Sequence, residues 1–100
     1  MPMKSERRIS KRFDFDSPVR YQEKGSQKIT NTTAKDLSNS GIGFISDEFI
    51  PKSSQLVFEI HPPGYQEYMK VLGEVMWVSN QPFSERFYVG ARFINPPEPV

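Results

Sequence analysis

The chain has 100 residues with a net charge of +1, and 36% of them are hydrophobic, 25% charged and 13% aromatic, which suits one small folded domain and leaves no room for two. It has no cysteine and one histidine, so disulfides, thiolate metal sites and multi-histidine zinc sites are excluded. No apolar run approaches the roughly 18 to 20 residues that span a bilayer, and the first residues show no signal peptide. We therefore expect a soluble, cytoplasmic protein without a metal.

Basic residues are concentrated in the N-terminal leader. Residues 1–12 hold five of the 13 Lys and Arg but only one of the 12 Asp and Glu, which gives this segment +4 and leaves −3 on the rest. Such a cationic, apolar-poor segment buries too little surface to offset its ordering entropy, so residues 1–16 are expected to form a flexible arm. The arm is either a solvated tail or a clamp for an anion.

From residue 17 onward the chain reads as short strands separated by turn residues. Alternating or threonine-rich segments predict six strands, at 18–22, 28–37, 42–46, 56–61, 69–78 and 86–94. Turn signals fall about every 8 to 15 residues, which is typical of an all-β barrel or sandwich. We assign residues 17–95 to this domain and residues 96–100 to a proline-rich tail with no structure of its own.

The fifth strand carries the only tryptophan of the chain. Simple alternation puts Trp77 on the face of Val71 and Val75, with Gly73 marking a bulge or bend. An indole on a barrel strand normally buries its ring, so we expect a core or rim residue, with stacking on a ligand as the alternative.

The first motif with chemical potential lies in the arm. Arg8 and Arg12 are four residues apart, and Arg7 precedes them directly. Guanidinium groups are planar forks that bind phosphate or the O6/N7 edge of guanine in a bidentate manner and also stack on purines. Taken alone, the cluster favours a solvated basic tail over a binding site, because single charge runs seldom encode a site.

The second motif is the turn after the second predicted strand. Asp36, Ser38 and Gly41 follow the pattern D-x-S-x-x-G, and Gly43 comes two residues later. A carboxylate accepts paired donors such as the N1 and N2 edge of guanine, a hydroxyl meets a base or phosphate, and glycine allows close approach. These residue types are also ordinary turn formers.

Together and in this order, the two motifs resemble the signature of the PilZ domain family of bacterial cyclic di-GMP receptors. Arg8 and Arg12 match its R-x-x-x-R motif, and Asp36, Ser38 and Gly41 match its [D/N]-x-S-x-x-G motif without a substitution. The resemblance extends over residues 6 to 95, including Trp77 and the ending Val-Gly-Ala-Arg-Phe of the last strand.

The resemblance implies a six-stranded antiparallel PilZ-type β-barrel with cyclic di-GMP on its outer surface, wrapped by the arginine arm. Arg8 and Arg12 are expected to bind guanine edges and phosphates, Asp36 and Ser38 to contact a guanine, and Gly41 to keep space clear. Arg7 implies that the ligand binds as an intercalated pair. We include Gly43 and Trp77 among the ligand-binding candidates. Many family members add a C-terminal helix, and we expect none in residues 96–100, which are rich in proline.

The resemblance also implies a receptor or adaptor and not an enzyme, since no nucleophile, base and orienting group can be named. Ligand is expected to order the arm and thereby change a surface that an effector protein reads. Two alternatives remain open. One is a small barrel that binds single-stranded nucleic acid, although a body at −3 lacks the expected basic stripe. The other is a degenerate domain that binds only protein.

Overall fold

Antiparallel β-strands make up the described part of the chain. The computed structural model describes residues 17–61, 66–96, 98 and 99, and among these it contains no helix. The same residues accordingly include no helix of the length and apolarity needed to cross a membrane. The strands are β1 (Ser17–Glu23), β2 (Ile29–Leu37), β3 (Gly41–Ser46), β4 (Gln55–Ile60), β5 (Met69–Asn80), β6 (Phe87–Phe93) and β7 (Glu98–Pro99).

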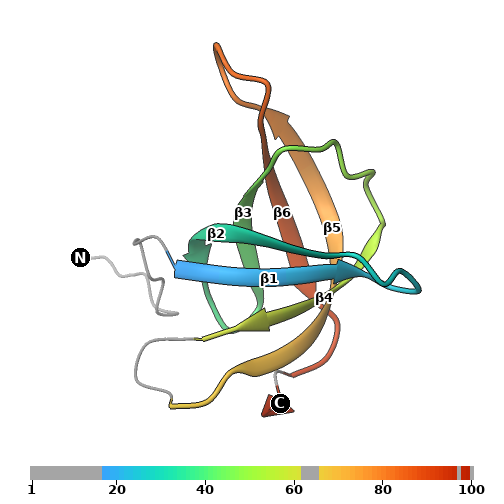
Figure 1. Cartoon of the computed structure of the whole chain (residues 1–100), viewed down its shortest axis with the longest axis vertical. Coiled ribbons are helices and arrows are strands. Elements are labelled where there is room, and N and C mark those ends of the chain that lie inside the picture. Colours follow the sequence, from blue (N-terminus) through green and yellow to red (C-terminus); the bar gives the residue numbers. More distant parts are fainter. Residues whose placement is uncertain (1–16, 62–65, 97, 100) are drawn as a thin grey trace, which may run out of the picture.

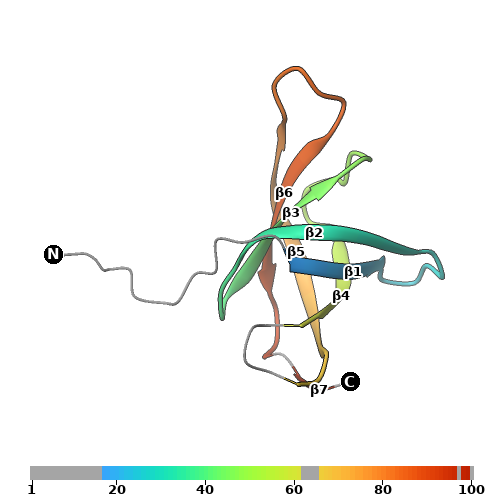
Figure 2. The same ribbon diagram turned by 60° about the vertical axis from the view of Figure 1, so that its left-hand side comes forward.

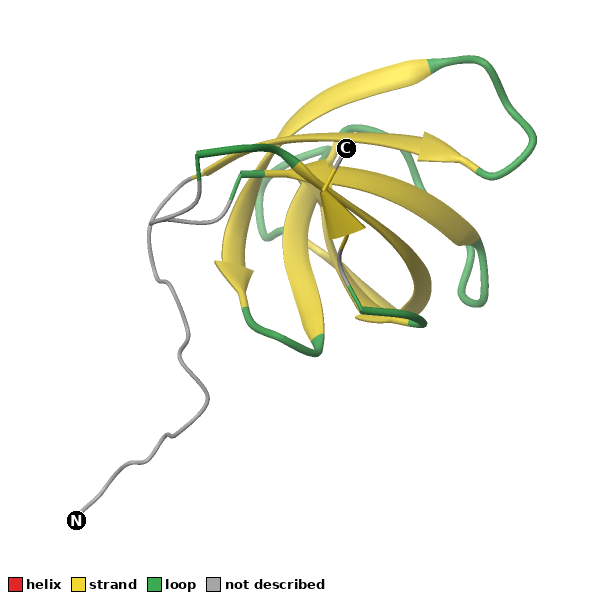
Figure 3. Ribbon diagram, turned by 90° about the horizontal axis from the view of Figure 1, so that it is seen from below, coloured by secondary structure: helices red, strands yellow, loops and turns green. Residues whose placement is uncertain are grey.

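The strands β1 to β6 form a closed barrel (Figure 1). Their order is β4-β1-β2-β3-β6-β5, and a further pairing of β4 with β5 closes the ring. The view from below shows how the strands curve around one another (Figure 3). Full closure leaves these six strands without an unpaired edge. The predicted all-β, six-stranded antiparallel barrel is confirmed.

Alternate residues of the strands point inward and fill the barrel. Phe44 and Phe58 are fully buried, and their rings meet edge to face with centroids 5.5 Å apart. The ring of Tyr21 lies 5.1 Å from that of Phe44. Burying these rings and the aliphatic side chains around them is the main stabilising term of a domain this small. The remaining core residues include Val19, Leu56, Ile60, Val71, Val75 and Val89.

Two β-bulges interrupt the alternation, one in β2 and one in β5. The register shifts between Ala34 and Asp36, and again between Val75 and Trp77, so Lys35 and Met76 are the extra residues. An extra residue reverses the face of everything after it. Trp77 therefore lies on the outer face with 47% of its surface exposed. The prediction that it shares a face with Val71 and Val75 is wrong for this reason.

Gly73 does not mark the bulge of β5. A Cβ built on Gly73 would lie 2.8 Å from a ring carbon of Phe58, so this glycine makes room for the core aromatic. The tail also differs from expectation, because Glu98 and Pro99 form the short strand β7 beside Lys70 and Met69 of β5. Figure 2 shows β7 at the lower end of the barrel. The prediction of a tail without structure is wrong for these two residues.

Candidate functional site

Four residues from four neighbouring strands lie in one row across the outside of the barrel. Asp36 of β2 pairs with Gly43 of β3, Gly43 pairs with Gly90 of β6, and Gly90 pairs with Trp77 of β5. At about 4.8 Å between strands, the row is about 14 Å wide. We call these four residues and Tyr88 the outer platform. Three of the predicted ligand-binding candidates, Asp36, Gly43 and Trp77, are thus brought together.

Trp77 covers Gly90 at one end of the outer platform. A Cβ built on Gly90 would lie 2.1 Å from Cε2 of the indole, so only glycine lets the ring lie this close to the strand. The indole and the Tyr88 ring form a T-shaped pair with centroids 5.2 Å apart and planes at 86°. Since 47% of Trp77 is exposed, the platform presents an aromatic surface suited to stacking a planar base.

Asp36 stands at the other end and is held by Tyr88. The Tyr88 hydroxyl donates a hydrogen bond of 2.5 Å to Oδ2 of Asp36. A Cβ built on Gly43 would lie 2.8 Å from both of these oxygens, so the bond passes directly over this glycine. Oδ1 of Asp36 has no donor among the residues described. One carboxylate oxygen is therefore fixed, and the other is available for a donor from outside.

The turn from β2 to β3 places Ser38 and Gly41 next to the outer platform. The Ser38 amide donates to the Gly41 carbonyl at 3.0 Å, and the Ser40 amide donates to Oγ of Ser38 at 3.3 Å. The Ser38 hydroxyl therefore stabilises the turn itself. A Cβ on Gly41 would lie 2.5 Å from the carbonyl oxygen of Ala91. This glycine is required by the packing of β3 on β6, whatever it does for a ligand.

Arg7, Arg8 and Arg12 lie outside the described residues. The described chain begins at Ser17, which pairs with Ala34 of β2, two residues before Asp36. An extended chain covers at most about 3.3 to 3.6 Å per residue, so the segment from position 12 to Ser17 can span up to about 18 Å and the segment from position 8 up to about 32 Å. The length of chain thus allows both arginines to reach the outer platform.

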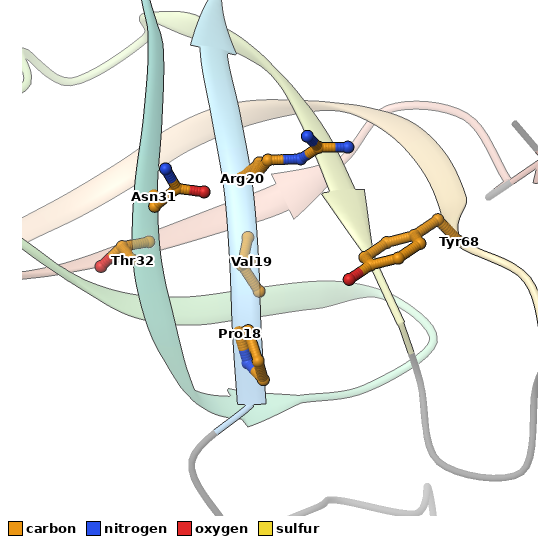
Figure 4. Close-up of a pocket in the computed structure, with 6 residues that line it drawn as sticks. All are labelled: Pro18, Val19, Arg20, Asn31, Thr32 and Tyr68. Carbon is orange, nitrogen blue, oxygen red and sulfur yellow. The ribbon is translucent and has the colours of Figure 1, made fainter.

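A separate groove of about 360 Å³ lies on the outer side of β1 and β2. Figure 4 shows Arg20 directed toward the side on which Tyr68 lies, away from Asn31 and Thr32. Arg20 forms an ion pair with Glu59, and its guanidinium carbon lies 5.8 Å from the centroid of Tyr68. The groove offers no carboxylate beside a turn, and its arginine is already engaged. It is lined by Pro18, Val19, Arg20, Asn31, Thr32 and Tyr68.

No group of three or more His, Asp or Glu side chains in the described part of the chain is placed to hold a metal ion. The outer platform instead presents a carboxylate, a phenol and an indole, which lie over the two glycines of the row. This set is chemically suited to a flat ring with donors at one edge.

Tyr88 and Gly90 belong to the outer platform but are not among the sequence-predicted candidates. Strand alternation places both on one face of β6, so their face was readable from the sequence. Their neighbours were not, because β6 pairs with β3 across a separation of more than 40 residues. Without that pairing nothing indicates that Tyr88 reaches Asp36.

Comparisons with known proteins agree with this geometry. The sequence model of the PilZ domain family matches residues 6–100 of the chain. Among solved structures, Bacillus subtilis MotI/DgrA, described as an inhibitor of motility, is 21% identical with a TM-score of 0.72, and the match covers 96% of this chain and 49% of that one. Borreliella burgdorferi PlzA, solved in complex with c-di-GMP, is 19% identical with a TM-score of 0.62, covering 94% and 37% of the two chains.

A search of curated proteins finds no significant match. The present chain spans about half the length of MotI/DgrA and less of PlzA. At these low identities the two likenesses concern the fold alone.

Proposed function

The chain belongs to the PilZ domain family, and from this premise we propose that it is a receptor for cyclic di-GMP and not an enzyme. The observation that carries the proposal is the row of Asp36, Gly43, Gly90 and Trp77, which sets a half-satisfied carboxylate and an exposed indole on one outer face. The carboxylate at one end of the row suits the hydrogen-bonding edge of a purine, and the indole at the other end suits stacking on the face of a purine.

In the proposed complex, one guanine lies on the outer platform. Oδ1 of Asp36 accepts from the N1 and N2 edge, while Tyr88 keeps Oδ2 and so fixes the plane of the carboxylate. Trp77 stacks on a base, and Ser38 contacts the guanine from the turn. Gly43 and Gly90 carry no side chain, so the Tyr88–Asp36 hydrogen bond and the indole of Trp77 lie close to the strands and together form the surface that receives the ring. Gly41 keeps the turn close to the barrel and leaves the approach clear.

Arg8 and Arg12 supply the positive charge for the two phosphates and bind guanine edges. Fixing the five residues 8–12 costs on the order of 5 to 10 kcal/mol of backbone entropy. Bidentate arginine contacts contribute about 1 to 3 kcal/mol each, and stacking adds about as much per base. A net binding free energy of about 8 kcal/mol, equivalent to a micromolar Kd, is consistent with these terms.

The proposed output is a change of surface. Residues 1–12 carry a net charge of +4, and the rest of the chain carries −3. When the phosphates of the ligand neutralise the arginines, this leader becomes fixed on the barrel. An effector protein then recognises the new surface. Arg7 directly precedes Arg8, as in family members that bind the ligand as an intercalated pair, and we propose the same here, with two molecules per chain at saturation.

Isothermal titration calorimetry with cyclic di-GMP tests the proposal. The wild-type chain is expected to bind in the micromolar range, and Arg8→Ala, Arg12→Ala and Asp36→Ala are each expected to weaken binding at least tenfold. Circular dichroism should show an unchanged barrel in all three. A stoichiometry that stays at one ligand per chain would reject the intercalated pair while leaving the receptor role intact.

Matched controls come from the same barrel. Arg20→Ala and Asp47→Ala remove an exposed arginine and an exposed aspartate that lie away from the outer platform, and both variants should bind like the wild type. A single-stranded oligonucleotide serves as a second ligand. Salt-sensitive oligonucleotide binding with no response to cyclic di-GMP would refute the proposal in favour of a nucleic-acid-binding barrel.

A further inference from the structure

The hairpin between β5 and β6 extends beyond the barrel and carries the most exposed large hydrophobic residue described. Figures 1 and 2 show this loop as the projection at the upper end. The relative exposure of Phe83 at its tip is 109%, and its φ is +57°. Phenylalanine rarely adopts this left-handed backbone conformation, which suits glycine or asparagine better.

Neither feature of Phe83 helps the barrel to fold. The ring buries nothing in the isolated chain, and the left-handed backbone disfavours a side chain of this size. A polar asparagine or a glycine would satisfy the same turn at lower cost. The aromatic ring at this position is therefore best explained by a contact outside the chain.

Hydrogen bonds on both sides of the tip brace the hairpin. The Gln81 amide donates to the Arg86 carbonyl at 3.0 Å, and the Arg86 amide donates to Oγ of Ser84 at 3.1 Å. Nε of Arg86 donates to Oδ1 of Asp47 at 3.1 Å, which ties the hairpin to the loop after β3. Pro82 fixes its own φ just before Phe83. An anchor prearranged in this way loses little entropy when it binds.

Two further residues define the chemistry around the tip. Phe49, 61% exposed, lies on the tied loop and meets Phe87 at the base of the hairpin with ring centroids 5.8 Å apart. Glu85 follows Phe83 by two residues and forms no ion pair with any described residue, whereas Arg86 is paired with Asp47. The hairpin tip, which we define as Phe83 and Glu85, thus combines an exposed aromatic ring with an uncompensated negative charge, and Phe49 adds an exposed ring at the base of the hairpin.

We propose that the hairpin tip docks a partner protein that offers an apolar pocket for Phe83, bordered by a lysine or arginine for Glu85. Aromatic anchors that fill a pocket dominate many protein interfaces. The negative charge beside the ring favours a protein over an anionic membrane surface, which would repel it. This surface is distinct from the outer platform, so the proposal extends beyond nucleotide binding.

Site-specific photocrosslinking in a lysate of the cells of origin, to which the purified photoreactive chain is added, tests the docking surface. The photoreactive amino acid p-benzoylphenylalanine replaces Phe83 in one version of the chain and Tyr68, an exposed aromatic on the other side of the barrel, in the control. Crosslinking is carried out with and without added cyclic di-GMP, so that failure of nucleotide binding leaves the test intact. Excess purified wild type, Phe83→Asn or Tyr68→Ser chain is added as competitor.

The expected result is one protein crosslinked from position 83 and not from position 68. As competitors, the wild-type and Tyr68→Ser chains should abolish the product crosslinked from position 83, and the Phe83→Asn chain should not. With the captured protein purified, Phe83→Asn and Glu85→Lys should each raise the Kd at least tenfold, while Phe83→Asn should unfold at the same or higher urea concentration than wild type. No product in either condition, a product with lipid or with a second copy of the chain, or equal competition by Phe83→Asn overturns the proposal.

Discussion

Replacing Gly90 by alanine tests the position of Trp77 most directly. A Cβ at Gly90 would lie 2.1 Å from Cε2 and 2.4 Å from both Cζ2 and Nε1 of the indole. All three separations are far below contact distance, so the ring must leave its place. The ring is free to move outward because 47% of Trp77 is already exposed. We therefore expect the barrel to remain folded but less stable.

The magnitude follows from the area that the indole covers. A tryptophan enclosed on all sides buries about 150 to 250 Å², so this half-exposed ring hides on the order of 100 Å², equivalent to about 2.5 kcal/mol. Gly90→Ala should forfeit part of this and destabilise by about 1 to 3 kcal/mol. In a Trp77→Ala background the clash is absent, and alanine should stabilise the strand by about 0.5 to 1 kcal/mol relative to glycine.

A double-mutant cycle measures this difference. Urea denaturation followed by circular dichroism gives the free energies of unfolding of wild type, Gly90→Ala, Trp77→Ala and the double variant. The expected coupling between the two sites is about 1.5 to 4 kcal/mol. Additive effects would show that the indole does not lie on Gly90, and a loss well above 3 kcal/mol for Trp77→Ala alone would place the ring in the core.

Two further substitutions probe the neighbouring positions. Gly41→Ala places a Cβ 2.5 Å from the Ala91 carbonyl oxygen; because a backbone atom in a paired strand cannot move aside, urea denaturation should show a loss of about 1 to 3 kcal/mol, and an unchanged midpoint would contradict the packing of β3 on β6. Tyr88→Phe removes the donor to Asp36 and should weaken cyclic di-GMP binding about three- to tenfold in calorimetry, with secondary structure retained; wild-type affinity would mean that the carboxylate needs no support.

The barrel was predictable because its core follows simple alternation. Leu56, Phe58 and Ile60 alternate with partly exposed residues and are all buried, as a half-buried strand requires. Turn residues such as Gly25, with φ +89°, also separate the strands where glycine is needed. Pattern and turn chemistry act over a few residues, so a single sequence reveals them.

The bulges were not predictable in this way. Whether Met76 is an extra residue depends on how β5 meets β6, since Val75 pairs with Ala91 and Trp77 with Gly90. Nothing within β5 distinguishes that arrangement from regular alternation. The same holds for the short strand β7, whose proline content argues against pairing, although an outer edge position tolerates it. Pairing between distant segments decides these features.

The bulges and the glycines together explain how one barrel gains a binding surface without losing its core. In regular alternation after Ala34 and Val75, Asp36 and Trp77 would both point inward, where a carboxylate and an indole would disrupt the packing around Phe44. One extra residue in each outer strand of the row turns them outward. Gly43 and Gly90 in the two inner strands then leave room for the side chains to lie flat. The two inserted residues therefore keep the binding surface on the outside of the barrel and the hydrophobic core on the inside. Deleting Met76 should turn Trp77 inward, so it should both weaken ligand binding and destabilise the barrel.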